Sequence, residues 1–160
     1  MIRKSIVFAV LSLFAGLALS GQNRPALPFP DLAGGIRSTP GCLGVETAQT
    51  SGGKLVIFAW FEDKAAVLRW YNSPMHQQVM KMVSPPNRAP LEGIADNSGP
   101  ILTIASVTPA EPTKDSPIPF SQIAIELYQP LPGGAFLNGR FAPASLKVPG
   151  MQGTFAGGAK

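Results

Sequence analysis

The sequence predicts one α+β domain, on the basis of three observations in the central part of the chain. Residues 54–62 (KLVIFAWFE) form an apolar run of strand length, with Gly-Gly before it and Asp after it. Apolar side chains then recur every three or four residues over 64–83, which is typical of short amphipathic helices. A second apolar run follows at 101–107 (ILTIASV). Helices between two sheet strands favour an α+β fold of split βαβ type, with an antiparallel sheet and helices on one face.

The first 20 residues have the organisation of a secretory signal peptide. Arg3 and Lys4 are followed by an uncharged apolar run at 6–19, and small residues at 18 and 20 predict cleavage before Gly21. The run is short for a membrane span, which needs about 20 apolar residues, although an uncleaved anchor is the alternative. We therefore expect a secreted or periplasmic protein with no stable membrane span after cleavage.

Charge and cysteine content argue against a nucleic-acid-binding protein and against a protein stabilised by an intrachain disulfide. Without Arg3 and Lys4 the formal net charge of +4 falls by two, and the basic residues are scattered singly. This is unlike a nucleic-acid-binding surface, so no nucleic acid is expected as a partner. Cys42 is the only cysteine. An intrachain disulfide is therefore excluded, and the thiol is expected to pack as a small hydrophobic group.

Proline and glycine divide the rest of the chain into three parts. The predicted parts are a Pro-rich segment at 21–38, the α+β domain at 39–142 and a tail at 143–160. Asp31 is the expected N-cap of a short helix over 32–37 within the Pro-rich segment. The tail offers little to bury, so we expect it to be mobile.

The strand at 54–62 is apolar on both of its faces. Residues 42–50 alternate in polarity, and the Thr-Ser-Gly-Gly turn at 50–53 predicts a hairpin that joins the two strands. A sheet in a two-layer domain has one covered face, so something else must cover the other. We expect that cover to be a second copy of the chain, which gives a homodimer.

Cap signals and turn residues place the remaining elements. Asp63 is the expected N-cap of a first helix, and Ser73-Pro74 supply the N-cap and first position of a second. Residues 121–128 (SQIAIELY) alternate as a strand, and 135–141 are expected to return as a short edge strand.

With these elements in order, the sequence resembles the antibiotic-biosynthesis monooxygenase superfamily. The resemblance covers about residues 39–83, with PGCLGVE, an apolar strand ending in Trp, an acidic residue, a helix with a central Trp, and Ser-Pro-x-His. The positions that carry it are Pro40, Gly41, Leu43, Glu46, Trp60, Trp70, Ser73 and His76. It implies a ferredoxin-like fold, a dimeric α+β barrel, and kinship with haem-degrading and cofactor-independent oxygenases.

The chain departs from the family at its first strand. Family members begin with a strand before their first helix, whereas only the Pro-rich segment precedes Asp31 here. The first strand is therefore atypical, and the strand at 123–128 is a candidate to take its place.

His76 is the only histidine, which excludes a Ser-His-Asp triad or a multi-histidine metal site within one chain. Its expected position near a helix start lowers the pKa of an imidazole and favours the neutral ring. The resemblance implies that His76 is the catalytic residue and the ligand of haem iron. The alternative is a ring that only hydrogen-bonds at the start of the helix.

Aromatic side chains are the other candidate site residues. We expect them to line a cavity for a small planar hydrophobic ligand between the sheet and the helices, and the alternative is that they form plain core. The predicted lining residues are Phe58, Trp60, Trp70 and Tyr71. Met80 lies one helical turn after His76, which raises a soft-metal alternative to ordinary methionine packing.

Two classes of function remain open. One is an exported module without a cofactor, used for ligand binding or assembly. The other is a cofactor-independent or haem-dependent monooxygenase that acts on a planar aromatic substrate. The second class requires a cavity that reaches the ring of His76.

Overall fold

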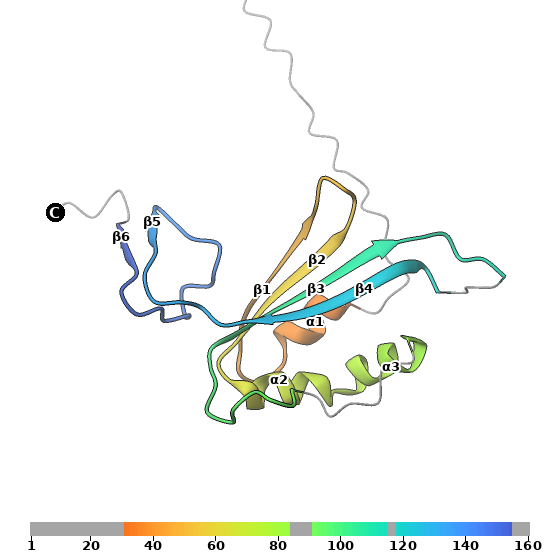
Figure 1. The fold of residues 1–160 in the computed structure, drawn as a ribbon, viewed down its shortest axis with the longest axis horizontal. Helices are drawn as coiled ribbons and strands as arrows, with labels where there is room; N and C mark the ends of the chain where they lie inside the picture. The colour runs from red at the N-terminus through yellow and green to blue at the C-terminus, as the bar shows by residue number, and fades with distance from the viewer. Residues whose placement is uncertain (1–30, 84–90, 115–117, 155–160) are drawn as a thin grey trace, which may run out of the picture.

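The computed structural model describes residues 31–83, 91–114 and 118–154, and it has the α+β architecture expected from the sequence (Figure 1). Three helices and four long strands make up the main body, and two short strands follow them. The helices are α1 (Leu32–Arg37), α2 (Lys64–Tyr71) and α3 (Pro74–Val83). The strands are β1 (Cys42–Gln49), β2 (Leu55–Phe61), β3 (Ile101–Pro109), β4 (Phe120–Tyr128), β5 (Ala135–Leu137) and β6 (Gln152–Thr154).

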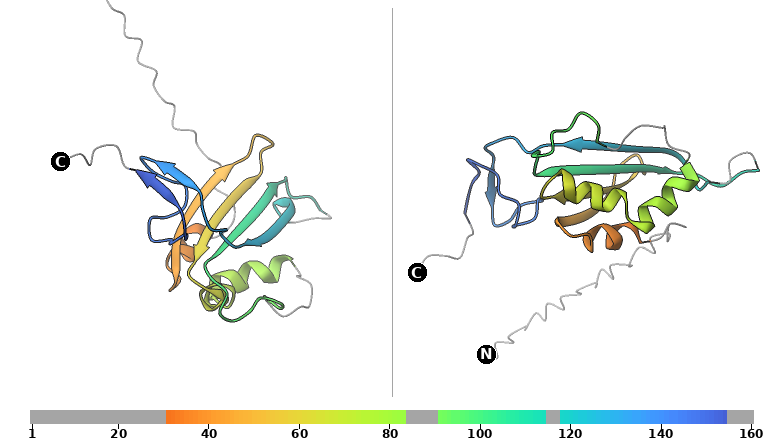
Figure 2. Two further views of the ribbon diagram at one scale, coloured as in Figure 1. Left: turned by 60° about the vertical axis from the view of Figure 1, so that its left-hand side comes forward. Right: turned by 90° about the horizontal axis from the view of Figure 1, so that it is seen from below.

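The main sheet is antiparallel throughout and has the strand order β1-β2-β3-β4. The helices lie on one side of it, as two views of the ribbon show (Figure 2). Among the described residues no strand precedes α1, and β4 is the outer strand beside β3. No helix in the described ranges is long and apolar enough to cross a membrane.

The three helices begin with the capping hydrogen bonds that the sequence predicts. The Asp63 carboxylate accepts the backbone N–H of Ala66 at 2.7 Å at the start of α2, and Asp31 accepts that of Gly34 at 2.9 Å at the start of α1. The Ser73 hydroxyl accepts the backbone N–H of His76 at 3.2 Å. Each of these contacts satisfies a backbone donor that a helix start leaves free.

The core lies between the helices and one face of the sheet. Because side chains alternate along a strand, Ala59 and Phe61 face the helices together with Val45 of β1 and Ile101 of β3. Phe61 is fully buried, and removing a ring of that size from a core costs about 3–5 kcal/mol. Phe61 of β2 and Ile101 of β3 are the largest fully buried side chains of the described residues.

Helix α1 belongs to this core. Its Ile36 is buried in the same cluster as Phe61 and Val67. The predicted domain start at residue 39 is therefore wrong, because the helix in the Pro-rich segment supplies part of the core.

The second face of the sheet is partly covered by the C-terminal residues of the same chain. The Phe141 ring lies 4.9 Å from that of Phe58 and 5.1 Å from that of Trp60, centroid to centroid. Leu146 is 3% exposed, and the Ser145 hydroxyl donates to the carbonyl of Leu43 at 3.3 Å. The predicted tail thus contributes one buried side chain, Leu146, in the described part of 143–154, while 155–160 lie outside the described residues.

The predicted edge strand at 135–141 also differs from what forms. Strand β5 covers only Ala135–Leu137 and pairs in parallel with β6, away from the main sheet (Figure 1). The positive φ angles of Gly133 and Gly134 turn the chain before β5, which separates it from β4.

Candidate functional site

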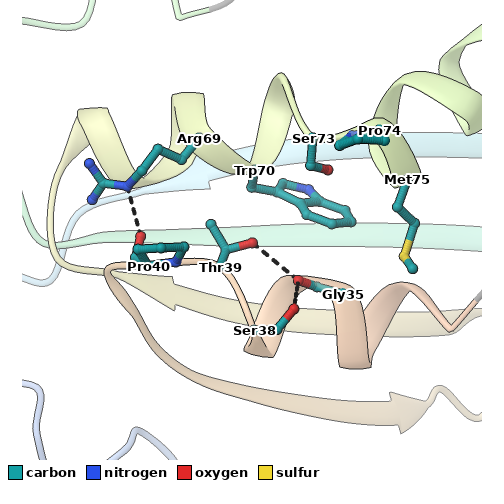
Figure 3. A pocket seen from close by; sticks show the side chains of 9 residues that line it. All are labelled: Gly35, Ser38, Thr39, Pro40, Arg69, Trp70, Ser73, Pro74 and Met75. Atoms are coloured by element: carbon teal, nitrogen blue, oxygen red, sulfur yellow. Dashed lines mark hydrogen bonds between the residues drawn. The ribbon is translucent and has the colours of Figure 1, made fainter.

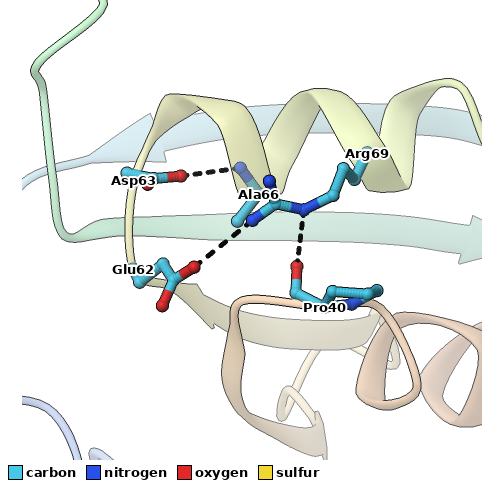
Figure 4. Close-up of polar contacts among 5 residues, drawn as sticks. All are labelled: Pro40, Glu62, Asp63, Ala66 and Arg69. Carbon is cyan, nitrogen blue, oxygen red and sulfur yellow. Dashed lines mark hydrogen bonds and ion pairs between the residues drawn. The ribbon is translucent and has the colours of Figure 1, made fainter.

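The helix pair that carries the predicted site residues is fixed to the turn before β1. Arg69 donates through Nε to the carbonyl of Pro40 at 2.9 Å, and its Nη2 lies 3.3 Å from Oε1 of Glu62 (Figure 4). The turn itself needs Gly41, whose φ is +84° and where a Cβ would lie 2.6 Å from that of Ala66. Exposed ion pairs contribute at most about 1 kcal/mol, so the Arg69 contacts orient α2 more than they stabilise it.

His76 lies in the first turn of α3 among aromatic side chains. Its ring centroid is 5.5 Å from that of Trp70 and 4.9 Å from that of Tyr71. Its Nδ1 is 2.8 Å from the carbonyl oxygen of Tyr71, which also accepts from Nε2 of Gln77 at 2.7 Å. The side chain is buried, with the residue 8% exposed.

These contacts determine the state of the ring. Burial lowers the pKa of His76 below its ordinary value, and the hydrogen bond to the Tyr71 carbonyl opposes that shift in part. Because a carbonyl can only accept, Nδ1 carries the proton of the neutral ring and Nε2 keeps a lone pair. The ring is therefore neutral at pH 7, as the sequence predicts, although burial is the cause of the lowered pKa.

A cavity of about 560 Å³ opens between α1 and the junction of α2 and α3 (Figure 3). The indole of Trp70 and the thioether of Met75 supply its apolar surface, and Arg69 stands at one end. The hydroxyls of Ser38 and Thr39 donate to the carbonyl of Gly35, at 2.9 and 3.1 Å. The lining residues are Gly35, Ser38, Thr39, Pro40, Arg69, Trp70, Ser73, Pro74 and Met75.

The approach of α1 to α3 at this cavity depends on a glycine. A Cβ at Gly35 would clash with the sulfur of Met75 and would lie 3.3 Å from Cζ3 of Trp70. The absence of a side chain at residue 35 thus lets Met75 pack over α1.

The cavity does not extend to the ring of His76. That residue lines neither this cavity nor a second one of about 480 Å³ near the ends of β3 and β4. The free Nε2 suits iron ligation, but the residue is buried and lines neither of these two cavities. The described residues therefore do not fit haem at His76, and they hold no cluster of His, Cys, Asp or Glu suited to a metal ion.

The four aromatic residues predicted to share one cavity lie on opposite sides of the sheet. Trp70 and Tyr71 are on the helix side, whereas Phe58 and Trp60 pack with Phe141 on the other face. The reason is strand alternation, because Ala59 and Phe61 occupy the helix side of β2. The prediction of a single aromatic cavity is therefore wrong, and of these four only Trp70 lines the cavity described above.

Several cavity residues carry no signal in the sequence. Gly35 and Ser38 come from α1 and its C-cap, which sequence patterns place outside the domain, and Thr39 is the first residue of the predicted domain. Arg69 reads as an ordinary exposed helix residue. Only the packing of α1 against α3 brings these groups together.

Comparison with known proteins identifies one family. No curated protein and no solved structure matches the chain significantly. The model of the antibiotic biosynthesis monooxygenase family matches residues 26–82, a stretch that holds α1, β1, β2, α2 and nearly all of α3. The resemblance predicted from the sequence is thereby confirmed: residues 26–82 are similar to the antibiotic biosynthesis monooxygenase family.

Proposed function

We propose that the protein is an exported, homodimeric ligand-binding module built on the antibiotic biosynthesis monooxygenase fold. Its ligand is a small planar hydrophobic molecule, bound in the cavity beside Trp70. The observation that carries this proposal is the cavity itself, an open hollow of about 560 Å³ whose surface is mostly apolar.

The chemical inventory favours binding over catalysis. The hydroxyls of Ser38 and Thr39 are held by the carbonyl of Gly35, and the Ser73 hydroxyl already accepts from α3. His76, the one imidazole, lies behind Trp70 and outside the cavity. The lining therefore presents an aromatic face with no general base directed at a ligand.

The second candidate function is a monooxygenase acting on a planar aromatic substrate, and the family match favours it. A cofactor-independent oxygenase of this kind needs a base that takes a proton from the bound quinol. The lone pair on Nε2 of His76 is the group with that ability in the α2–α3 region, and it would need Trp70 to move aside.

Homodimerisation is proposed through the uncovered part of the second sheet face. Phe58, Leu102 and Ile104 lie together there in the register of β2 and β3, and each is only partly buried. The C-terminal residues cover Trp60, and the Phe141 ring also packs against Phe58, whereas Leu102 and Ile104 keep partly exposed side chains.

Tryptophan fluorescence tests the ligand site, because the chain has two tryptophans and one of them lines the cavity. In Trp60→Phe, Trp70 is the sole reporter, and 1,4-naphthoquinone is expected to quench it saturably. In Trp70→Phe, the remaining Trp60 is expected to show only collisional quenching. Equal quenching of both variants would contradict the proposed site.

The same probe separates binding from catalysis. The corresponding quinol, incubated with the protein in air, is expected to consume oxygen at the uncatalysed rate. Protein-dependent oxygen uptake that His76→Ala abolishes would establish the monooxygenase function instead.

A further inference from the structure

The outer strand β4 presents an unusually open edge. It pairs with β3 on one side, and its residues from Ser121 to Tyr128 are all exposed. Ile123, Ile125 and Leu127 are 40%, 55% and 37% exposed. By the sheet register these three share the helix side with Ala59 and Ile57, yet the helices do not extend over them.

The two outer strands of the sheet, β1 and β4, differ in how far other residues cover them. The C-terminal residues cover the first part of strand β1, since the Leu43 carbonyl accepts from Ser145 and Pro143 packs beside Gly44, while Glu46 to Gln49 are exposed. Strand β4 has no proline or lysine, and Glu126 is its one charged residue. Natural edge strands usually carry such features, because free backbone groups otherwise pair with another strand.

The sequence of β4 is also symmetric in chemical character. Positions at equal distances on either side of Ala124 in FSQIAIELY carry similar side chains in most cases. The successive pairs are Ile with Ile, Gln with Glu, Ser with Leu, and Phe with Tyr. A strand of this kind can pair antiparallel with its own copy so that like side chains stand opposite one another on each face.

From the open edge and this symmetry we propose that β4 is an interaction surface for a second copy of the chain. The two β4 strands pair antiparallel about a two-fold axis through Ala124 and join the two sheets into one of eight strands. The helices of both copies then lie on the same side. Ile123 and Ile125 of one copy meet Ile125 and Ile123 of the other, which buries the exposed apolar row.

The polar side chains select this register. On the opposite face, Gln122 stands across from Glu126 of the second copy, so an amide donor meets a carboxylate, twice by symmetry. The register centred on Ile125 would place each Glu126 against the methyl group of Ala124. The register centred on Glu126 would bring two carboxylates together, which is unfavourable.

This contact is independent of the ligand cavity and of the contact through the second sheet face. Edge pairing buries a small area, so association is expected in the micromolar range. If both protein contacts form, each chain contacts two copies and the assembly is larger than a dimer, and each interface variant reduces it to a dimer.

Sedimentation velocity of the mature chain at about 5 and about 500 µM tests the proposal over the range expected of a small interface. Ile125→Lys changes an exposed side chain, so circular dichroism should show an unchanged fold while the highest mass falls. Phe58→Asp tests the sheet-face contact separately. A mass unaffected by Ile125→Lys, or a wild-type monomer at the higher concentration, would overturn the proposal.

A charge exchange tests the register. Gln122→Glu places carboxylates opposite Glu126 of the copy and should weaken association about tenfold. The double variant Gln122→Glu, Glu126→Gln restores an amide–carboxylate pair and should recover wild-type affinity. Failure of the double variant to recover it would overturn the pairing about Ala124.

Discussion

The carbonyl oxygen of Tyr71, the last residue of α2, lies 2.8 Å from Nδ1 of His76 in the first turn of α3. This contact spans the break at Asn72 and Ser73, so the imidazole joins the end of one helix to the start of the next. The same carbonyl accepts from Gln77. The histidine that the family resemblance marks as a catalytic residue is thus also a structural link between α2 and α3.

Replacing His76 with alanine is expected to lower the free energy of unfolding by about 1–3 kcal/mol, because it removes a buried hydrogen bond and ring packing. His76→Asn is the matched control, since its amide can donate to Tyr71 and should recover part of the loss. Urea unfolding of the three proteins gives the measurement.

A haem titration of the same proteins tests iron ligation directly. Wild type and His76→Ala are expected to give the same absorbance trace in the Soret region, because neither cavity reaches the ring. A Soret band that is present in wild type and absent from His76→Ala would show that the imidazole binds iron.

The pH dependence of stability follows from the lowered pKa of His76. The unfolded chain binds a proton near the ordinary value of 6.5, whereas the folded chain binds it only at lower pH. Just below 6.5 the unfolded state therefore holds more protons, so stability rises with pH across this window and is lost as pH falls. The difference in unfolding free energy between wild type and His76→Asn should shrink from about pH 7.5 to pH 5. A difference that stays constant would contradict a buried neutral ring.

The parts of the fold that follow from the sequence are those that local chemistry determines. Asp63 and Ser73 are cap residues whose hydrogen bonds reach only three positions along the chain, and both form as expected. The runs around Phe61 and Ile101 are apolar enough to define central strands wherever they pair. The family resemblance adds the order of the elements over 26–82.

The site depends on contacts between distant residues, which local patterns do not encode. Alternation shows that Trp60 and Phe61 face opposite ways, but packing against α1 decides which of them is core. The meeting of Gly35 with Met75 and the contact of Ser145 with Leu43 of β1 join residues far apart in the chain. The segments at both ends of the chain are rich in proline and glycine, so they show no periodic pattern from which these contacts could be predicted.

Export is expected to remove residues 1–20. The charged start and apolar run predict cleavage before Gly21. Intact-mass measurement of the protein recovered from the medium or periplasm should give the chain that starts at Gly21. A species that retains Met1–Ser20 in a membrane fraction would indicate an uncleaved anchor.

Phe58→Asp is expected to disrupt the proposed contact through the second sheet face. The substitution places a carboxylate among apolar side chains, which costs several kcal/mol when a second copy covers it. Light scattering should show the dimer in wild type and a smaller species in the variant. Glu46→Gln, on the same face next to Phe58 in the register, is a conservative control that should keep the wild-type mass.

Gly35→Ala tests the packing that shapes the ligand cavity. Alanine normally stabilises a helix interior by up to about 1 kcal/mol relative to glycine. Here the added methyl group meets the sulfur of Met75, so the variant is expected to be less stable than wild type by about 1–2 kcal/mol.

The direction of this effect should reverse once the sulfur is removed. In a Met75→Ala background the same Gly35→Ala change meets only the edge of Trp70, at 3.3 Å, and helix propensity should then make it stabilising. Thermal or urea unfolding of the four proteins completes the double-mutant cycle. If Gly35→Ala has the same sign in both backgrounds, residue 35 does not contact Met75, and the cavity wall between α1 and α3 is arranged differently.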